Sequence, residues 1–435
     1  MKKYIHVIGG GLAGCEAAHF IAGAGVKVCL WEMRPRQTTP VHSGGDLAEL
    51  VCSNSLKSEL QDTAQGLLKM EMDLLGSLVL KCARLTRVPA SAALAVDRKR
   101  FSALMTQSIL ENQNIEVIRR EITELPADGI CIIATGPLTS EALSKYLQKM
   151  TGRNNLFFYD AIAPSVTAQS IDYQKVFRAS RYNKGEADYL NCPFSRTEYE
   201  DFYYNLVAAD VKSAAAIDAD RFFNACMPVE VMAAKGVDTL RFGPMRPVGL
   251  LPPGTDERPY AVVQLRQEDK EGNIFGLVGF QSRMRWGEQE RVFRMIPGLE
   301  NAEFVRFGSM HRNTYINSPL ILNPTLQSKN RENIFWAGQI TGVEGYMESA
   351  ASGIFAGINA LRLYRGLDLL VLPPETMMGA LLNFIGTAET RNFQPVNANF
   401  GILPPLRNNI KDKRRRYSLY VGRAWELMTK FSELL

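Results

Sequence analysis

The first forty residues combine short apolar runs with a glycine-rich turn, and this pattern predicts a strand–helix–strand unit. Apolar side chains at positions 5, 7 and 8 predict a first strand, and the Ala-rich stretch 12–24 predicts a helix. The next apolar run, residues 26–33, predicts a second strand that ends before Pro35. We therefore expect a βαβ unit of about 30 residues at the start of the chain.

The pattern changes twice further along the chain. Helical segments are predicted at about 63–85 and 98–112, and the run 115–126 is predicted to form a pair of strands. The apolar run at 130–133 predicts a strand, followed by a Gly-Pro turn and a helix with Thr139 or Ser140 as its N-cap.

From about residue 157, strand-like runs alternate with Pro- and Gly-rich pieces, which predicts a mixed α/β insertion. A strand, a glycine turn and a helix then return after residue 331. We predict one Rossmann-type domain built from residues 1–160 and 331–435, with an inserted substrate domain at 161–330. A basic amphipathic helix is predicted at the C-terminal end.

Composition narrows the classes of protein that fit. The chain has 435 residues, 46% hydrophobic and 22% charged, and no apolar run of 18 residues, so we expect a cytoplasmic protein without a membrane span. A net charge of +5 permits a polyanionic partner without requiring one. Seven cysteines without a CxxC pair argue against a secreted disulfide scaffold and a zinc ribbon, and we expect no metal.

The glycine turn carries the first candidate site. Gly9, Gly11 and Gly14 fit the G-x-G-x-x-G pattern, in which the glycines allow a tight turn, close approach to a pyrophosphate and close helix–strand packing. Glu32, at the end of the second strand, is placed to accept hydrogen bonds from ribose hydroxyls. These features predict a bound dinucleotide.

Two later segments favour FAD over NAD. "ICIIATGP" and "NIFWAGQITG" resemble the second and third segments of FAD-binding proteins, although Gln339 stands where such proteins usually carry Asp. The fold class expected is therefore α/β, a glutathione-reductase-type FAD-binding Rossmann domain with an inserted mixed α/β domain. The residues expected at the cofactor from these segments are Gly9, Gly10, Gly11, Leu12, Ala13, Gly14, Glu32, Thr135, Gly136 and Gly338.

Cys52, in the polar stretch "ELVCSNS", has three possible roles: packing, half of a redox disulfide, or a nucleophile. Cys192 and Cys226 lie in similar contexts close to prolines, so local sequence does not separate them. The remaining cysteines fit apolar strands or helix faces, where packing is the expected role: Cys15, Cys29, Cys82 and Cys131.

Longer motifs run in order along nearly the whole chain: "GGGLAGCEAA", "WEMRP", "AELVCSNSLKS", "ATGPLTSEAL", "CMPVEVMA", "FGPMRPVGL", "MHRNTYINSP", "AGQITGVEGYMESAASG" and "NFQPVNANFG". On these motifs the chain resembles the folate- and FAD-dependent tRNA (uracil-5-)-methyltransferase family. The resemblance implies C5-methylation of the T-loop uridine at position 54 of tRNA. It also implies 5,10-methylenetetrahydrofolate as carbon donor, FAD as cofactor and NAD(P)H as reductant.

The resemblance also implies roles for single residues. Cys52 and Cys226 match the two catalytic cysteines of the family, and Tyr346 is implied to stack on the flavin ring. Three residues of the same segment are implied to approach the flavin: Gly342, Glu344 and Gly345. His311 and Arg312 are candidates for contact with folate or flavin.

No compact RNA-binding motif is visible, so contacts with the T-arm of tRNA are expected from basic side chains. Arg283 and Arg285 are candidates, with Trp286 as a stacking surface. The second candidate is the basic cluster of the C-terminal tail: Lys411, Lys413, Arg414, Arg415 and Arg416.

Two other functions compete with this one. A branch of the family acts on a uridine of ribosomal RNA. A flavin-dependent thiol–disulfide oxidoreductase would use Cys52 and Cys226 as its redox pair, but such enzymes usually place two cysteines close together in sequence.

Overall fold

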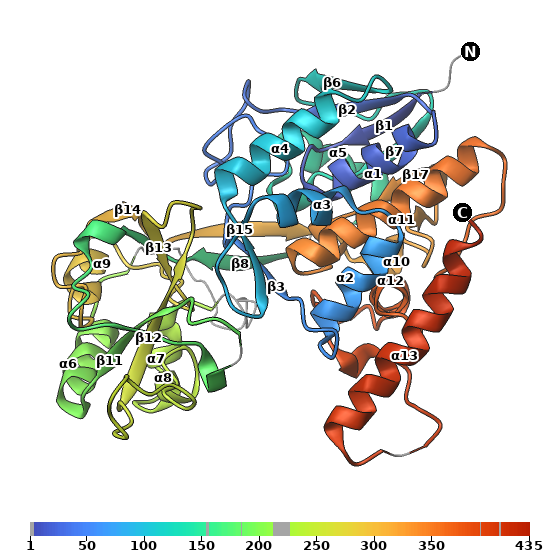
Figure 1. Ribbon diagram of the computed structural model, residues 1–435. Coiled ribbons are helices and arrows are strands. Elements are labelled where there is room, and N and C mark those ends of the chain that lie inside the picture. Colours follow the sequence, from blue (N-terminus) through green and yellow to red (C-terminus); the bar gives the residue numbers. More distant parts are fainter. Residues whose placement is uncertain (1–3, 154–155, 184, 212–226, 392, 409) are drawn as a thin grey trace.

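The larger part of the chain is built around a six-stranded sheet (Figure 1). The computed structural model describes residues 4–153, 156–183, 185–211, 227–391, 393–408 and 410–435. In spatial order, the strands of this sheet are β16 (Gln327–Ser328), β17 (Arg331–Trp336), β7 (Ile130–Ile133), β1 (Ile5–Ile8), β2 (Val28–Glu32) and β6 (Ile115–Arg119). All neighbours are parallel except β16 and β17.

The sheet joins the two ends of the chain. β17 pairs with β7, with Phe335 opposite Ile132, although about two hundred residues separate them in sequence. Side chains alternate between the two faces: Phe335 packs in one apolar core, whereas Ile334 and Trp336 pack in another on the opposite face. The main domain therefore comes from both ends of the sequence.

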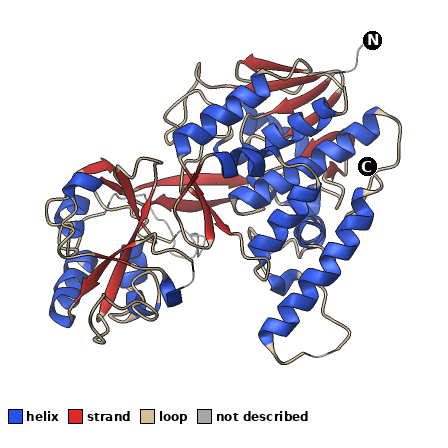
Figure 2. Cartoon of the chain, in the orientation of Figure 1, coloured by secondary structure: helices blue, strands red, loops and turns tan. Residues whose placement is uncertain are grey.

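Helices cover both faces of this sheet (Figure 2). The helices of this domain are α1 (Leu12–Gly23), α2 (Ala64–Leu74), α3 (Leu78–Leu85), α4 (Arg98–Leu110), α5 (Glu141–Thr151), α10 (Ser318–Ile321), α11 (Tyr346–Tyr364), α12 (Met377–Thr387) and α13 (Lys413–Ser432). Three short 3₁₀ turns are η1 (Gly136–Leu138), η6 (Gln339–Thr341) and η7 (Phe400–Ile402). α1 packs along α11, and Gly353 permits their close approach because a Cβ there would overlap the backbone of Ala13.

Two sequence predictions for this domain need correction. The stretch 63–85 forms α2 and α3 instead of one continuous segment, because Gly76 adopts a left-handed φ of 75° between them. The stretch 115–126 forms one strand, β6, and not a pair. The N-cap of α5 is Ser140, whose hydroxyl accepts from the Leu143 N–H at 3.4 Å, as one of the two predicted alternatives.

The inserted domain has its own antiparallel sheet and its own apolar core (Figure 1). In spatial order its strands are β10 (Phe177–Arg178), β11 (Leu190–Phe194), β12 (Ala261–Gln267), β13 (Ile274–Leu277), β9 (Ser165–Thr167) and β14 (Phe304–Arg306). Its helices are α6 (Arg196–Val207), α7 (Val229–Ala233), α8 (Thr239–Phe242) and α9 (Trp286–Phe293), with 3₁₀ turns η2 (Ala168–Ser170) and η3 (Arg181–Asn183).

Two small sheets lie where the domains meet. The chain enters the inserted domain through β8 (Leu156–Ile162) and returns through β15 (Ser309–Tyr315), and these strands pair antiparallel as a ribbon between the domains (Figure 1). A second sheet contains β3 (Ser55–Ser58), β5 (Ala93–Val96) and β4 (Arg87–Val88). In the part of the chain that the structure describes, no helix is long and apolar enough to cross a membrane.

Candidate active site

The predicted glycine turn joins β1 to α1 and requires glycine at two positions for steric reasons. Gly9 has a φ of 109°, and a Cβ on it would overlap the carbonyl oxygen of Ala134 at the end of β7. A Cβ on Gly14 would overlap the carbonyl oxygen of Gly9. Gly11 has no atom within 4 Å of its Cβ position, so the backbone is open to a ligand there.

A cleft that is open to solvent lies over this turn. Ten of the residues predicted at the cofactor line it: Gly9, Gly10, Gly11, Leu12, Ala13, Glu32, Thr135, Gly136, Gly338 and Tyr346. The first N–H groups of α1 have no partner within the helix and carry the positive end of its dipole, so this wall suits a pyrophosphate. The cleft thus has the backbone geometry that a dinucleotide requires.

Four other predicted residues do not line the cleft. Gly14 lies behind it and allows α1 to pack against β1. Gly342, with a φ of 84°, lies against the ring of Phe393. Gly345, with a φ of 124°, is the N-cap of α11, and buried Glu344 precedes it. Gly342, Glu344 and Gly345 shape the turn that brings Tyr346, the first residue of α11, to the cleft.

Glu32 is fixed at the cleft wall by neighbours that the sequence did not identify. It accepts hydrogen bonds from the N–H of Gly10 and the N–H of Arg34, each at 2.9 Å. The Arg34 guanidinium bridges Glu32 at 3.1 Å and Glu49 at 3.0 Å. Burial alone would raise the pKa of Glu32, but Arg34 and these hydrogen bonds outweigh burial and lower it. The group that faces the cleft is therefore a carboxylate.

Cys52 lies in the loop between Val51, which lines the cleft, and β3, and the residue is partly buried. Its N–H donates to the phenol oxygen of Tyr346 at 2.8 Å, and the N–H of Ser53 donates to the same oxygen at 3.4 Å. Tyr346 also lines the cleft, so one side chain contacts both the candidate cofactor site and the cysteine loop. Burial raises the pKa of Tyr346, which keeps the phenol neutral.

Five other cysteines are buried, as packing residues are expected to be: Cys15, Cys29, Cys82, Cys131 and Cys192. Burial raises the pKa of the Cys131 thiol to about 12, which makes it a poor nucleophile. Cys226, the second predicted catalytic cysteine, lies outside the described residues. The flanks of the segment that contains it are described: Val211 bridges to Met284, and the N–H of Val229 donates to Gln281 at 2.7 Å.

The ribbon β8–β15 brings further polar groups to the edge of the cleft. His311 is buried, and its Nδ1 has no hydrogen-bond partner among the described residues. Burial lowers the pKa of His311 to about 4, so the imidazole is neutral. The backbone of Arg312 belongs to β15, and its side chain lies outside the description.

Glu344 lies beside this ribbon. Its carboxylate accepts a hydrogen bond from the Gln339 amide at 2.6 Å. Burial, followed by the nearby carboxyl group of Asp160, raises the pKa of Glu344 well above its usual range. This site therefore holds an uncharged carboxyl group that sequence alone could not identify as such.

The predicted RNA contacts of the inserted domain already have acidic partners. The guanidinium of Arg283 lies 3.8 Å from the Glu230 carboxylate, and that of Arg285 forms an ion pair with Asp210 at 2.8 Å. Trp286 is 57% exposed and stacks on Phe307, with ring centroids 5.4 Å apart. Four of the five basic residues of the tail are fully exposed, and Arg416 is half-buried.

Sequence reasoning missed several residues of the site. Arg34, His42 and Glu49 line the cleft, and the only signal for them was their place in the irregular stretch after the first βαβ unit. Arg266 and Arg306 of the inserted domain donate to the cysteine loop, and no local pattern identifies them because their partners are more than two hundred residues away.

Comparisons with known proteins show the family and support the fold. The family described as Glucose inhibited division protein A (GIDA) matches residues 4–368. A protein of Syntrophomonas wolfei, "Methylenetetrahydrofolate--tRNA-(uracil-5-)-methyltransferase TrmFO", is 62% identical over 433 residues, which are 100% of this chain and 99% of the relative. A protein of the same name from Geobacter sulfurreducens is 57% identical over 417 residues, 96% of each chain. The structure of Aquifex aeolicus GidA covers 99% of this chain and 74% of its own, with a TM-score of 0.72 at 18% identity, which supports the fold.

Proposed function

This chain belongs to the family of folate- and FAD-dependent tRNA (uracil-5-)-methyltransferases, and from that premise we propose that it methylates C5 of the T-loop uridine at position 54 of tRNA. 5,10-Methylenetetrahydrofolate provides the carbon, and NAD(P)H provides the electrons. The observation that carries the proposal is the hydrogen bond from the Cys52 N–H to the Tyr346 phenol oxygen, which holds the cysteine loop beside the dinucleotide cleft that Tyr346 lines.

The cleft fits FAD in three respects. The open backbone at Gly11 and the start of α1 receive the pyrophosphate, Glu32 accepts from the ribose, and Gly338 and Tyr346 lie toward the flavin end. When bound, FAD supplies the methylene carrier and the reducing equivalents for the methyl group.

The residues of the chain activate the uracil. C5 of uracil is a weak nucleophile, but addition of a thiolate to C6 moves an electron pair toward O4 and makes C5 enolate-like. A base must then remove the proton from C5 after the new carbon–carbon bond has formed, and the thiolate must leave C6 to restore the C5–C6 double bond of the product. We assign these two roles to Cys52 and Cys226, one as nucleophile and one as acid–base group.

Tyr346 and the buried groups of the ribbon prepare the site. The Tyr346 phenol accepts from the backbone of Cys52 and fixes the thiol beside the cleft. His311, neutral at physiological pH, contacts folate or flavin. Glu344, uncharged and outside the cleft lining, holds the turn before Tyr346 through its hydrogen bond with Gln339. The exposed tail cations Lys411 and Lys413 contact phosphates of the T-arm.

The direct test uses purified protein, unmodified tRNA transcript, labelled methylenetetrahydrofolate and either NADPH or NADH. We expect label in 5-methyluridine of the transcript, and none in a matched transcript whose position 54 is cytidine. Label in a ribosomal RNA fragment alone would replace the tRNA assignment. Absence of label in both RNAs would remove the proposed function.

The role of the thiols is tested in the same assay. Cys52→Ser and Cys226→Ser are each expected to lower the rate of methyl transfer by about 10³-fold or more, since each removes a group that acts in the chemical step. Cys192→Ser is the matched control, because Cys192 is a buried cysteine of the inserted domain. Full activity of both Cys52→Ser and Cys226→Ser would exclude the two-thiol mechanism.

A further inference from the structure

The cysteine loop of the main domain is held by two arginines of the inserted domain. The carbonyl of Val51 accepts from Arg306 Nη1 at 3.5 Å, and the hydroxyl of Ser53 accepts from Arg266 Nη2 at 2.8 Å. The residue between these two contacts is Cys52. The thiol therefore lies in a loop whose neighbours on both sides bind cations from across the domain boundary.

These arginines belong to a cluster with an excess of positive charge. Glu268 Oε1 lies 2.7 Å from Arg98 Nη2 and 3.7 Å from Arg306 Nη2. Arg266, on β12, also acts electrostatically on Glu268, which follows that strand, so three guanidinium groups act on one carboxylate. Burial and the nearby Arg98 lower the pKa of Arg306 to about 10, which still leaves it charged at neutral pH, and its field reaches Cys52 and Tyr346.

Two titratable groups of the main domain that interact with Cys52 favour their uncharged forms. Tyr346, at the start of α11, and Glu344, in the preceding turn, both interact with Cys52. Burial raises the pKa of each, so their uncharged forms are favoured. Glu268 is ionised, but Arg98 and the hydroxyl of Ser165, at 2.9 Å, already bind its oxygens.

We propose that Arg306 is a positioning residue for Cys52: it fixes the loop through Val51 and favours the thiolate over the thiol. A neighbouring guanidinium stabilises a thiolate, and the thiolate is the nucleophilic form of cysteine. Because Arg306 comes from the inserted domain, docking of that domain onto the main domain completes the reactive cysteine. The inference depends on the proposed function in one respect only, namely that the thiolate attacks the uracil of tRNA.

The test measures the thiol directly, without tRNA or folate. The holoprotein is alkylated with iodoacetamide in a reductant-stabilised buffer from pH 5.5 to 10, and the Cys52 peptide is quantified by mass spectrometry. Arg306→Gln is expected to raise the midpoint of the pH–rate profile by about one pH unit. Arg306→Lys restores the charge and is expected to return the midpoint close to that of the unsubstituted protein.

A second variant predicts the opposite sign. Glu268→Gln removes the carboxylate that partly neutralises Arg306, so the midpoint is expected to fall. The matched control is Arg294→Gln, because the Arg294 side chain also donates to a backbone carbonyl, that of Ala302 at 3.0 Å, but does so within the inserted domain, at the end of α9. Its midpoint is expected to stay unchanged.

Three results would overturn the proposal: an unmoved midpoint in Arg306→Gln, a midpoint raised by Glu268→Gln, or an equal shift in Arg294→Gln. A role of Arg306 in loop structure alone would change the alkylation rate at every pH and leave the midpoint where it was. A negative result in the alkylation test does not change the outcome of the methyl-transfer assay, so the two proposals are judged separately.

Discussion

Two glycines of the cofactor turn, Gly11 and Gly14, lack a Cβ for different reasons. Behind the turn, Gly14 lies so close to the carbonyl of Gly9 that any side chain would separate α1 from β1. At the front, Gly11 has a φ of −78°, which every residue tolerates, and open space at its Cβ position. Gly14 therefore serves packing, and Gly11 leaves the space that we propose for the ligand.

This contrast predicts different defects for two similar substitutions. Gly14→Ala is expected to destabilise the fold by about 3 kcal/mol or more, because backbone must move to admit the methyl group. Gly11→Ala is expected to cost about 1 kcal/mol or less in stability but to lower flavin affinity at least about tenfold, since the methyl group enters the ligand's space. Urea unfolding measures the loss of stability in each variant, and the flavin-to-protein absorbance ratio measures the loss of flavin. Full flavin content in Gly11→Ala would show that the pyrophosphate lies elsewhere.

At the scale of elements, two buried acids accept hydrogen bonds from the first N–H groups of helices that lie far from them in sequence. Glu71 of α2 accepts from the N–H groups of Met377 and Met378 at the start of α12, both at 2.7 Å. Glu16 of α1 binds the start of α3 through Ser77, Leu78 and Val79 in the same manner. These carboxyl groups supply the acceptors that helix starts need, and they join helices that the sequence pattern presents as independent.

Burial raises the pKa of Glu71 to about 8 and that of Glu16 to about 7. Between pH 4.5 and about 8 the folded protein therefore holds a proton at Glu71 that the unfolded chain has released, so the free energy of unfolding falls as pH rises through this window. Glu71→Gln is expected to flatten this dependence by about 1–3 kcal/mol between pH 5 and 8 in urea titrations. Exposed Glu111→Gln is the control, with an unchanged pH dependence. If the free energy of unfolding depends on pH equally in Glu71→Gln and in the unsubstituted protein, Glu71 is ionised in the fold.

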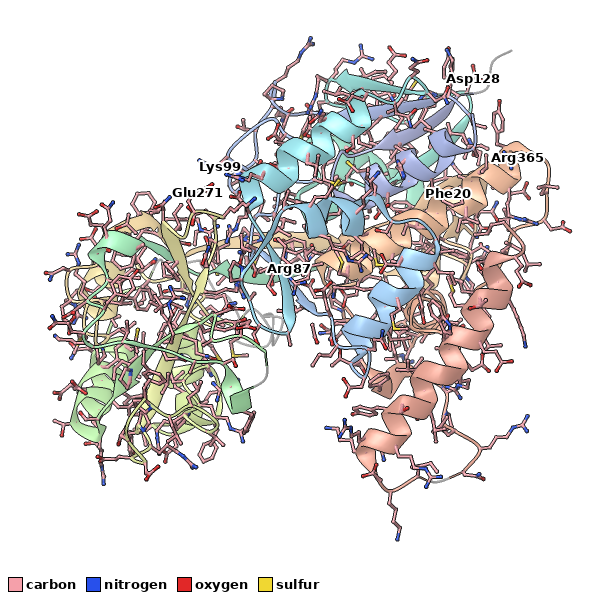
Figure 3. All side chains as sticks on the ribbon, viewed as in Figure 1. Phe20, Arg87, Lys99, Asp128, Glu271 and Arg365 are labelled. Carbon is pink, nitrogen blue, oxygen red and sulfur yellow. The ribbon has the colours of Figure 1, made fainter. Side chains whose placement is uncertain are left out.

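At the scale of the whole molecule, polar contacts fix how the two domains meet. Helix α4 of the main domain meets the β12–β13 turn of the inserted domain through the pairs Arg98–Glu268 and Arg100–Glu271, and Figure 3 labels Lys99 and Glu271 on the two sides of this junction. Arg98 and Glu268 form the inner ion pair, with side chains only 15% and 11% exposed. Arg100 and Glu271 form an outer pair that is about half exposed, 48% and 49%.

The two pairs provide an internal comparison of buried and exposed charge. Arg98→Gln leaves Glu268 buried with a weaker partner and is expected to lower stability by about 2–4 kcal/mol. Arg100→Gln removes a solvent-screened pair and is expected to cost less than about 1 kcal/mol. Thermal unfolding of both variants tests this, and separation into two transitions in Arg98→Gln would show that the inner pair couples the domains. Equal losses in both variants would contradict the ranking.

Local patterns identified elements well where hydrophobic periodicity and turn residues agreed. β1, α1, β2, β7 and the C-terminal helix follow directly from apolar spacing and the flanking glycines. The break at Gly76 and the missing second strand after β6 did not follow, because tertiary packing and not local periodicity decides where such segments end. Side chains that act across the domain boundary, such as Arg306, leave no local signal at all.

The sequence by itself determined the nucleotide turn, because a glycine pattern between a strand and a helix has one steric solution, and it singled out Cys52 through the family motif. Only the tertiary structure decided which groups surround that thiol. Tyr346 reaches it across 294 positions of sequence, and Arg306 adjoins it from the other domain. Proximity, burial and charge are properties of space rather than of sequence order, and they set the protonation of Glu32, His311 and Glu344 in the folded protein.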